Sequence, residues 1–180
     1  MLIDAERSLL LIIDVQEKLL PVIHESERVV DNVGWLVRLA QRLGLPVAAT
    51  EQYPKGLGPT EKTVRALLPE GAIATKNHFS AVAAQCLRSL PGADRPQVVI
   101  AGIEAHVCVL QTTLELLEEG REVYVVADCV SSRREPDVRM ALLRMQQDGA
   151  RIVTREMVAY EWLGEAGTPL FREISKEFLR

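Results

Sequence analysis

Six short, mainly apolar runs recur along the chain, and they constrain its fold more than any other feature. A continuous apolar run of four or five residues is typical of a strand buried on both faces, as in a parallel sheet. A strand with one face in water would instead alternate apolar and polar residues. We therefore expect strands at residues 9–13, 46–50, 72–75, 97–101, 123–127 and 150–153.

Helical patterns lie between these runs. Apolar residues recur at steps of three and four over residues 29–43, 110–117 and 138–145, and a glycine follows each pattern. Further helices are expected over residues 81–90, where the pattern is weaker, and over residues 155–163 and 169–179. Alternating strands and helices predict a three-layer α/β/α sandwich. Its six-stranded parallel sheet is expected in the order 3-2-1-4-5-6, a Rossmann-like arrangement.

The composition fits one domain and excludes several classes of function. A chain of 180 residues suits a single domain over residues 1–180. With 21 Lys and Arg against 25 Asp and Glu, the net charge of −4 argues against nucleic-acid binding, because no basic excess neutralises phosphates. No apolar stretch approaches the roughly 20 residues that a membrane span needs. Three cysteines and no signal peptide indicate a reducing, cytoplasmic compartment.

Reactive side chains follow three of the expected strands. Asp14 closes the first strand, Lys76 follows the third and Cys108 follows the fourth. Open α/β sheets bind ligands at the carboxyl ends of their strands, so these three side chains are expected to converge. Cys108 also begins a helix, and we expect the helix dipole and Lys76 to lower the pKa of its thiol. The set predicts an activated nucleophile, although a buried and inert cysteine is the alternative.

Five segments resemble a known family. They are LLLIIDVQ at 9–16, TEQYPKGLGPT at 50–60, TKNHFSA at 75–81, AGIEAHVCV at 101–109 and ADCVSSR at 127–133. In this order they resemble the isochorismatase-like hydrolase superfamily of cysteine hydrolases. The segment at 50–60 further resembles the isochorismatase-domain-containing subgroup, whose substrate is unassigned.

The resemblance implies a catalytic triad and a reaction. Cys108 would be the nucleophile, Asp14 the general base, and Lys76 would stabilise both charges. The family has a non-proline cis peptide, here between Ile103 and Glu104, which would turn backbone N–H groups, including that of Cys108, toward an oxyanion. The implied function is hydrolysis of a C–N bond in a small amide or ureido compound, without a cofactor. A homo-oligomer, dimeric or larger, is also implied.

This sequence differs from some members of the family at residues of the site, and these differences argue against two of the family's activities. Isochorismatases proper do not need a cysteine at the position of Cys108. Nicotinamidases hold a metal with an Asp and two His near the second strand, where this chain has Glu51 and Gln52 and no His. The three histidines lie in separate segments, so we expect no metal site.

Several other residues are candidates for the substrate pocket or for redox chemistry. The pocket candidates are Gln52, Tyr53, His78, Phe79 and His106. Gln52 and Tyr53 could instead cap the loop, His78 could lie in solvent, and His106 could contact another subunit. Cys86 lies among apolar residues and is expected in the core, whereas Cys129 is expected near the site. Cys129 as a resolving thiol would fit the competing function, a non-enzymatic or redox-responsive protein that keeps the fold.

Overall fold

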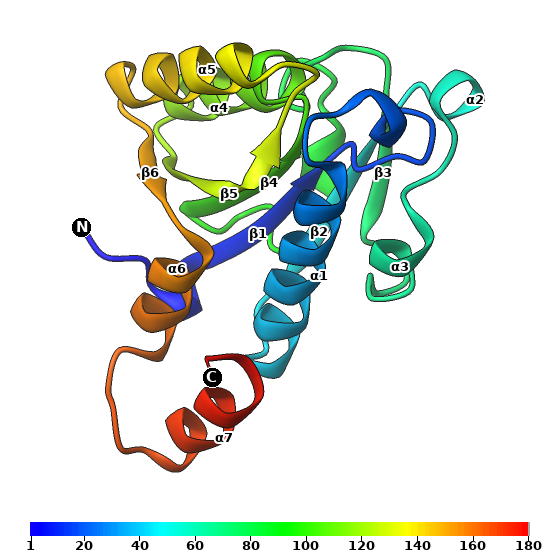
Figure 1. Ribbon diagram of the computed structural model, residues 1–180. Coiled ribbons are helices and arrows are strands. Elements are labelled where there is room, and N and C mark those ends of the chain that lie inside the picture. Colours follow the sequence, from blue (N-terminus) through cyan, green and yellow to red (C-terminus); the bar gives the residue numbers. More distant parts are fainter. Residues whose placement is uncertain (180) are drawn as a thin grey trace.

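The computed structural model describes residues 1–179 and contains one parallel sheet with the strand order β3-β2-β1-β4-β5-β6 (Figure 1). The strands are β1 (Ser8–Ile13), β2 (Val47–Gln52), β3 (Ile73–Lys76), β4 (Gln97–Ile103), β5 (Glu122–Ser131) and β6 (Arg151–Val153). All six lie at the runs that the sequence marked, and the predicted strand order is confirmed. The order reverses between β1 and β4, so the switch point lies beside Asp14.

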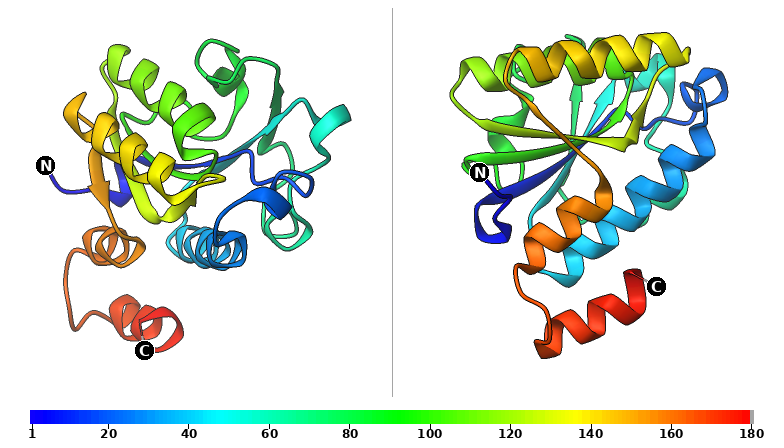
Figure 2. Two further views of the ribbon diagram at one scale, coloured as in Figure 1. Left: turned by 45° about the horizontal axis from the view of Figure 1, so that its top comes forward. Right: turned by 60° about the vertical axis from the view of Figure 1, so that its left-hand side comes forward.

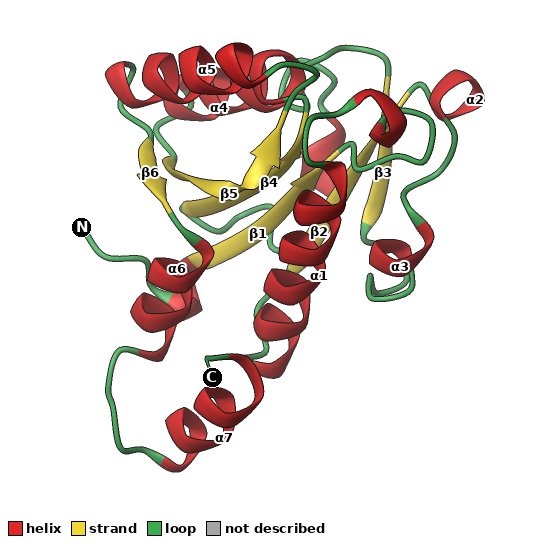
Figure 3. Cartoon of the chain, viewed as in Figure 1, coloured by secondary structure: helices red, strands yellow, loops and turns green. Residues whose placement is uncertain are grey.

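Helices cover both faces of the sheet and form the two outer layers of the sandwich (Figures 2 and 3). The α-helices are α1 (Ser26–Arg42), α2 (Pro54–Leu57), α3 (Lys62–Arg65), α4 (Leu110–Glu118), α5 (Glu135–Gln147), α6 (Arg155–Leu163) and α7 (Pro169–Phe178). Short helical turns are η1 (Ala5–Arg7), η2 (Leu20–Val22), η3 (Cys86–Ser89) and the π-helical turn η4 (Ala105–Val109). Helices α1 and α6 cover one face, and α4 and α5 cover the other. None of the helices described has both the length and the apolar character of a membrane span.

The central strand β1 shows why its apolar run is continuous. All six of its residues are buried. Leu10 and Ile12 pack in the core beneath α1, whereas Leu9, Leu11 and Ile13 pack in the core beneath α4 and α5. Successive side chains of a strand point to opposite faces, so a strand between two helical layers needs an apolar residue at every position.

The segment between β3 and β4 differs from the expected helix at 81–90. It consists of turns and the four-residue η3. The hydroxyl of Ser80 accepts hydrogen bonds from the backbone N–H groups of Val82 and Ala83, at 3.1 and 3.2 Å. Such local bonds give the backbone an alternative to a helix, and Gln85 then takes a left-handed conformation with φ 55°. Residues 51–60 contain the end of β2 and the single turn α2.

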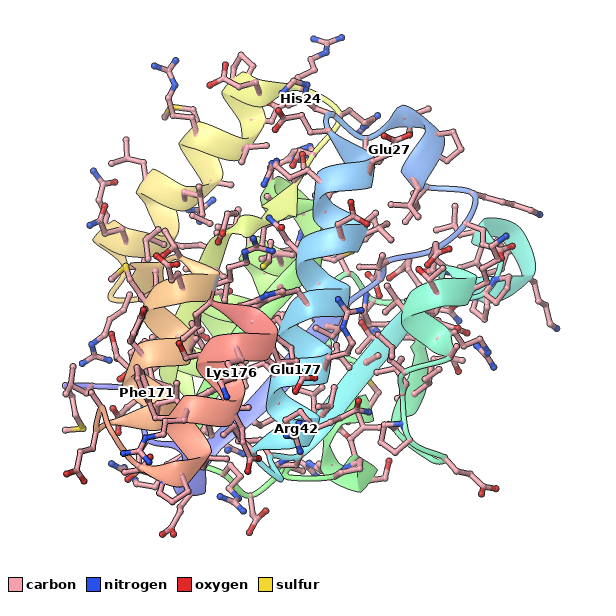
Figure 4. All side chains as sticks on the ribbon, turned by 60° about the horizontal axis from the view of Figure 1, so that its bottom comes forward. His24, Glu27, Arg42, Phe171, Lys176 and Glu177 are labelled. Carbon is pink, nitrogen blue, oxygen red and sulfur yellow. The ribbon has the colours of Figure 1, made fainter. Side chains whose placement is uncertain are left out.

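Helix α7 packs against α1 at the margin of the molecule (Figure 4). The rings of Trp35 and Phe178 meet edge to face, with centroids 5.7 Å apart, and Ile174 is fully buried. Arg42 forms ion pairs with Glu173 and Glu177, at 3.3 and 3.1 Å. The buried and aromatic contacts therefore hold this helix, since exposed ion pairs add little.

Candidate active site

A buried ion pair lies at the carboxyl ends of β1 and β3. Asp14 directly follows β1 and has a positive φ of 49°, which aspartate tolerates better than most residues. Lys76 ends β3, and its Nζ lies 2.7 Å from Oδ2 of Asp14. Neither side chain is exposed to solvent. Because two charges are costly to bury, such a pair requires further hydrogen bonds to satisfy it.

Neighbouring strands supply these bonds. Thr50, on β2, donates its hydroxyl proton to Oδ1 of Asp14 at 2.7 Å, so both carboxylate oxygens are engaged. The Lys76 ammonium also donates to Oε1 of Gln52 at 2.7 Å and to the backbone carbonyl of Phe79 at 3.0 Å. An ammonium has three protons, and these three acceptors satisfy them. The geometry therefore fixes the position of the pair.

Cys108 lies beside this pair, in the π-helical turn η4 that leads into α4. Its side chain is buried, and the residue is 7% exposed. Burial raises the pKa of the thiol to about 12; the Asp14 carboxylate also raises it, and Lys76 lowers it. The expectation of a lowered thiol pKa is therefore wrong, because burial and Asp14 outweigh Lys76. The resting group is a neutral thiol that needs a base.

The backbone before Cys108 approaches β1 closely. Gly102 lies opposite Ile13 with φ +123°, and a Cβ at this position would lie 2.1 Å from the Ile13 carbonyl oxygen. Only glycine permits this approach. The next peptide bond, between Ile103 and Glu104, is cis. The Glu104 carbonyl accepts hydrogen bonds from the N–H groups on either side of Cys108, those of Val107 and Val109, at 3.0 and 3.2 Å.

Gln52 forms hydrogen bonds with other residues of the site. Besides bonding Lys76, it donates from Nε2 to the Asn77 carbonyl at 2.8 Å. Its backbone N–H donates to Oε1 of Gln16 at 2.7 Å. The side chain therefore positions Lys76. Gln16 and Thr50 were not singled out from the sequence, although Thr50 pairs in register with Ile13, the residue before Asp14.

Two of the remaining pocket candidates, Tyr53 and His78, line a cavity beside the ion pair, whereas Phe79 does not. A cavity of about 450 Å³ beside β3 is lined by Tyr53, Pro54, Lys55, Thr75, Lys76, Asn77, His78 and Ala84. Tyr53 and Phe79 are about half exposed, at 53% and 51%. Phe79, Asp14 and Cys108 are absent from the lining of this cavity.

Glu104 and His106 bond instead to the segment after β5. Nδ1 of His106 lies 2.9 Å from Oγ of Ser132. Glu104 forms an ion pair with Arg133 at 2.9 Å. These contacts tie the turn before Cys108 to the end of β5, a link that the sequence did not reveal.

The other two cysteines do not lie where the sequence predicted them. Cys129 is fully buried in the core beneath α1, whereas Cys108 belongs to the core on the opposite face of the sheet. Cys129 therefore cannot act as a resolving thiol, and the expectation that it lies near the site is wrong. Cys86 is half-buried, not a full core residue. Burial raises the pKa of its thiol, Lys76 lowers it and Asp14 raises it, so Cys86 lies within electrostatic reach of the ion pair.

Metal-ligating side chains do not gather in the structure. Among residues 1–179, no group of three or more His, Cys, Asp and Glu side chains is placed to hold a metal ion. Glu51 has other partners. Its Oε1 accepts hydrogen bonds from the backbone N–H and hydroxyl of Thr60, and it forms an ion pair with Arg65 at 2.8 Å. It anchors the loop after β2.

Comparisons with known proteins agree on a family. The sequence profile described as "Isochorismatase domain" matches residues 8–157. Isochorismatase domain-containing protein 2 from Macaca fascicularis is 45% identical over 145 residues, which cover 78% of this chain and 68% of the relative. A structure described as MAR1 ribonuclease from Caenorhabditis elegans has a TM-score of 0.89 and 38% identity, covering 100% of this chain and 93% of that one. The YcaC gene product of Escherichia coli, described as an octameric hydrolase of unknown specificity, has a TM-score of 0.87 and 25% identity, covering 99% and 96%.

Proposed function

The chain belongs to the isochorismatase domain family and has its hydrolase fold, and from this premise we propose that it is a cysteine hydrolase of a small amide or ureido compound. The observation that carries the proposal is the buried Asp14–Lys76 ion pair beside the Cys108 thiol. A carboxylate, an ammonium and a thiol in one water-poor site supply a base, a fixed positive charge and a nucleophile.

The first half of the proposed reaction forms a thioester-type intermediate. Asp14 accepts the proton of the Cys108 thiol as the sulfur attacks the carbonyl carbon of the substrate. The backbone N–H of Cys108 is assigned to the oxyanion, since the N–H groups of Val107 and Val109 donate to the Glu104 carbonyl. Asp14 then gives the proton to the leaving nitrogen, the C–N bond breaks, and ammonia or an amine departs. The raised thiol pKa fits this order, since the proton leaves as the substrate is attacked.

The second half releases the acid. A water molecule gives a proton to Asp14, and its oxygen attacks the thioester carbon. The C–S bond breaks, and the Cys108 sulfur recovers the proton from Asp14. Lys76 stays charged throughout and stabilises the Asp14 carboxylate whenever it is unprotonated. No net electron transfer occurs, and the reaction requires no cofactor.

The experiment that tests this proposal is a turnover assay with a panel of small amides and ureido compounds. Wild-type protein should release ammonia or an amine from at least one of them. Cys108→Ala should lose the activity, and Cys86→Ala and Cys129→Ala are the matched controls, since neither thiol takes part. Mass spectrometry should detect an acyl group on Cys108 during turnover. Lack of turnover across the panel, or full activity of Cys108→Ala, contradicts the proposal.

Two further assays distinguish the proposed hydrolase from a ribonuclease and from a redox-responsive protein. The C. elegans structural neighbour is described as a ribonuclease, so an RNA oligonucleotide belongs in the assay. The net charge of −4 disfavours a polyanion as substrate, and we expect no cleavage. Rapid oxidation of Cys108 without any turnover would favour a redox-responsive protein. The raised thiol pKa disfavours that function, because the thiolate is the readily oxidised form.

We also propose that the protein acts as a homo-oligomer. The E. coli neighbour YcaC is described as octameric, and it aligns with 99% of this chain. Exposed apolar side chains on α5 and α6, including Met140 and Tyr160, support an association of subunits.

A further inference from the structure

A second cavity lies away from the catalytic site. It has a volume of about 320 Å³ and is bounded by Leu9 on β1, Val98 on β4 and Leu116 on α4. Leu9 and Val98 pair with each other near the amino ends of their strands, whereas Asp14 and Cys108 follow the carboxyl ends. The cavity therefore opens at the other end of the sheet.

The irregular segment between β3 and β4 produces this cavity. Turns and the short η3 stand where a full helix would cover β1 and β4. Ser80 and Ala81 hold the start of the segment on α4, through Ser80 Oγ to Glu115 at 2.6 Å and Ala81 N–H to Thr112 at 3.0 Å. From there the chain bridges the sheet, and Ala83 and Leu87 form the outer wall.

The cavity has an apolar floor and a positively charged mouth. Leu9, Val98 and Leu116 are buried and form the floor. Arg88, Glu119 and Arg121 lie at the mouth, where two positive charges face one negative charge. Arg121 is held there because its guanidinium donates to the carbonyls of Ala93 and Arg95. Arg88 is exposed and forms no ion pair with any residue from 1 to 179.

We propose that this cavity binds a small monocarboxylate with an apolar body, such as a medium-chain fatty acid. Its volume is within the range of small-molecule sites, and few polar groups at the mouth would fix the ligand's orientation. The apolar chain contacts the leucine and valine floor, and the carboxylate meets the guanidinium of Arg88, whose planar fork suits it, while Arg121 adds a second positive charge. The proposal concerns binding alone and does not depend on the proposed hydrolase reaction.

The test is an NMR titration of the methyl groups with sodium octanoate, with octylamine as the matched ligand of opposite charge. Octanoate should shift the methyl signals of Leu9, Val98 and Leu116, and octylamine should bind at least about tenfold more weakly. No shift of these methyls with octanoate overturns the site. Equal affinity for the amine overturns the assignment of a carboxylate.

A variant separates the cavity from non-specific binding. Ala83 is exposed and lines the mouth, so Ala83→Trp should block the cavity without disturbing the core. We expect octanoate affinity to fall by more than about tenfold, whereas Ala166→Trp, an exposed and remote control, leaves it unchanged. Unchanged affinity in a folded Ala83→Trp protein contradicts the proposal.

Discussion

At the scale of single residues, Asp14 and Lys76 have opposite effects on the Cys108 thiol. The carboxylate raises the thiol pKa and the ammonium lowers it, in addition to the larger effect of burial. The folded protein therefore binds the thiol proton more tightly than the unfolded chain, whose cysteine pKa is near 9.0. The resulting stability is fully present below about pH 9 and is lost as pH rises toward about 12.

Alkylation by iodoacetamide tests these opposite effects. The wild-type rate at Cys108 should rise with a midpoint near pH 12, far above that of a free thiol. Asp14→Asn removes a charge that raises the pKa, so its midpoint should fall. Lys76→Met removes a charge that lowers the pKa, so its midpoint should rise. Circular dichroism must show that both variants are folded at the pH of the assay, because breaking a buried pair costs roughly 3–5 kcal/mol. Midpoints that move in the same direction would contradict the arrangement.

Thr50 gives a prediction about positioning. Its hydroxyl donates to Oδ1 of Asp14 at 2.7 Å in a fully buried setting. Thr50→Val keeps the shape but leaves the carboxylate oxygen without a donor, so urea denaturation should show a loss of about 1–3 kcal/mol in the free energy of unfolding. Thr50→Ser keeps the hydroxyl and should lose less. If the serine and valine variants are equally stable, the hydrogen bond contributes nothing.

At the scale of elements, the pairing of β1 with β4 brings the Cys108 turn to Asp14. Gly102 pairs with Ile13, the last residue of β1, at a distance that excludes a side chain. Gly102→Ala should therefore cost more than about 3 kcal/mol in the free energy of unfolding, or prevent folding. Gly120→Ala is the matched control: its φ is +80°, but a Cβ there meets no atom within 4 Å. It should cost about 1–2 kcal/mol. Similar losses in the two variants, measured by urea denaturation, would mean that backbone conformation alone explains Gly102.

Elements with a strong apolar period were predictable from the sequence, and the segment between β3 and β4 was not. The apolar period over residues 29–43 predicted a helix, and α1 occupies Ser26–Arg42. The weaker pattern at 81–90 does not form the expected helix, because Ser80 and Thr112 make hydrogen bonds with the backbone of this segment. The bond to Thr112 joins residues 31 positions apart, so a periodic pattern carries no trace of it, whereas the bonds to Ser80 are local.

At the scale of the whole molecule, sheet topology decided which site residues could be foreseen. The strand order brings Asp14 and Lys76 to the same edge of the sheet, at the ends of β1 and β3 on either side of β2, and the structure pairs them. The face on which Cys129 lies depends on register. Ile100 pairs with Val125 but Gly102 pairs with Val130, so β5 has an irregularity between Val125 and Val130, the interval that contains Cys129. The alternation of side chains along β5 therefore could not predict on which face of the sheet Cys129 lies, because one extra residue in a strand moves every later side chain to the opposite face.

Self-association is the last property that belongs to the whole molecule. Met140 and Leu143 on α5 are 56% and 44% exposed, and residues three apart share one face of a helix. If this face joins subunits, Met140→Glu with Leu143→Glu should shift the protein to a smaller assembly in light scattering, without lowering the stability of the exposed helix. Val22→Glu changes an isolated residue of equal exposure, 57%, and should leave the assembly unchanged. A wild-type mass equal to one chain of 20.0 kDa would contradict the proposed homo-oligomer, and a double variant that assembles as the wild type does would move the interface away from α5.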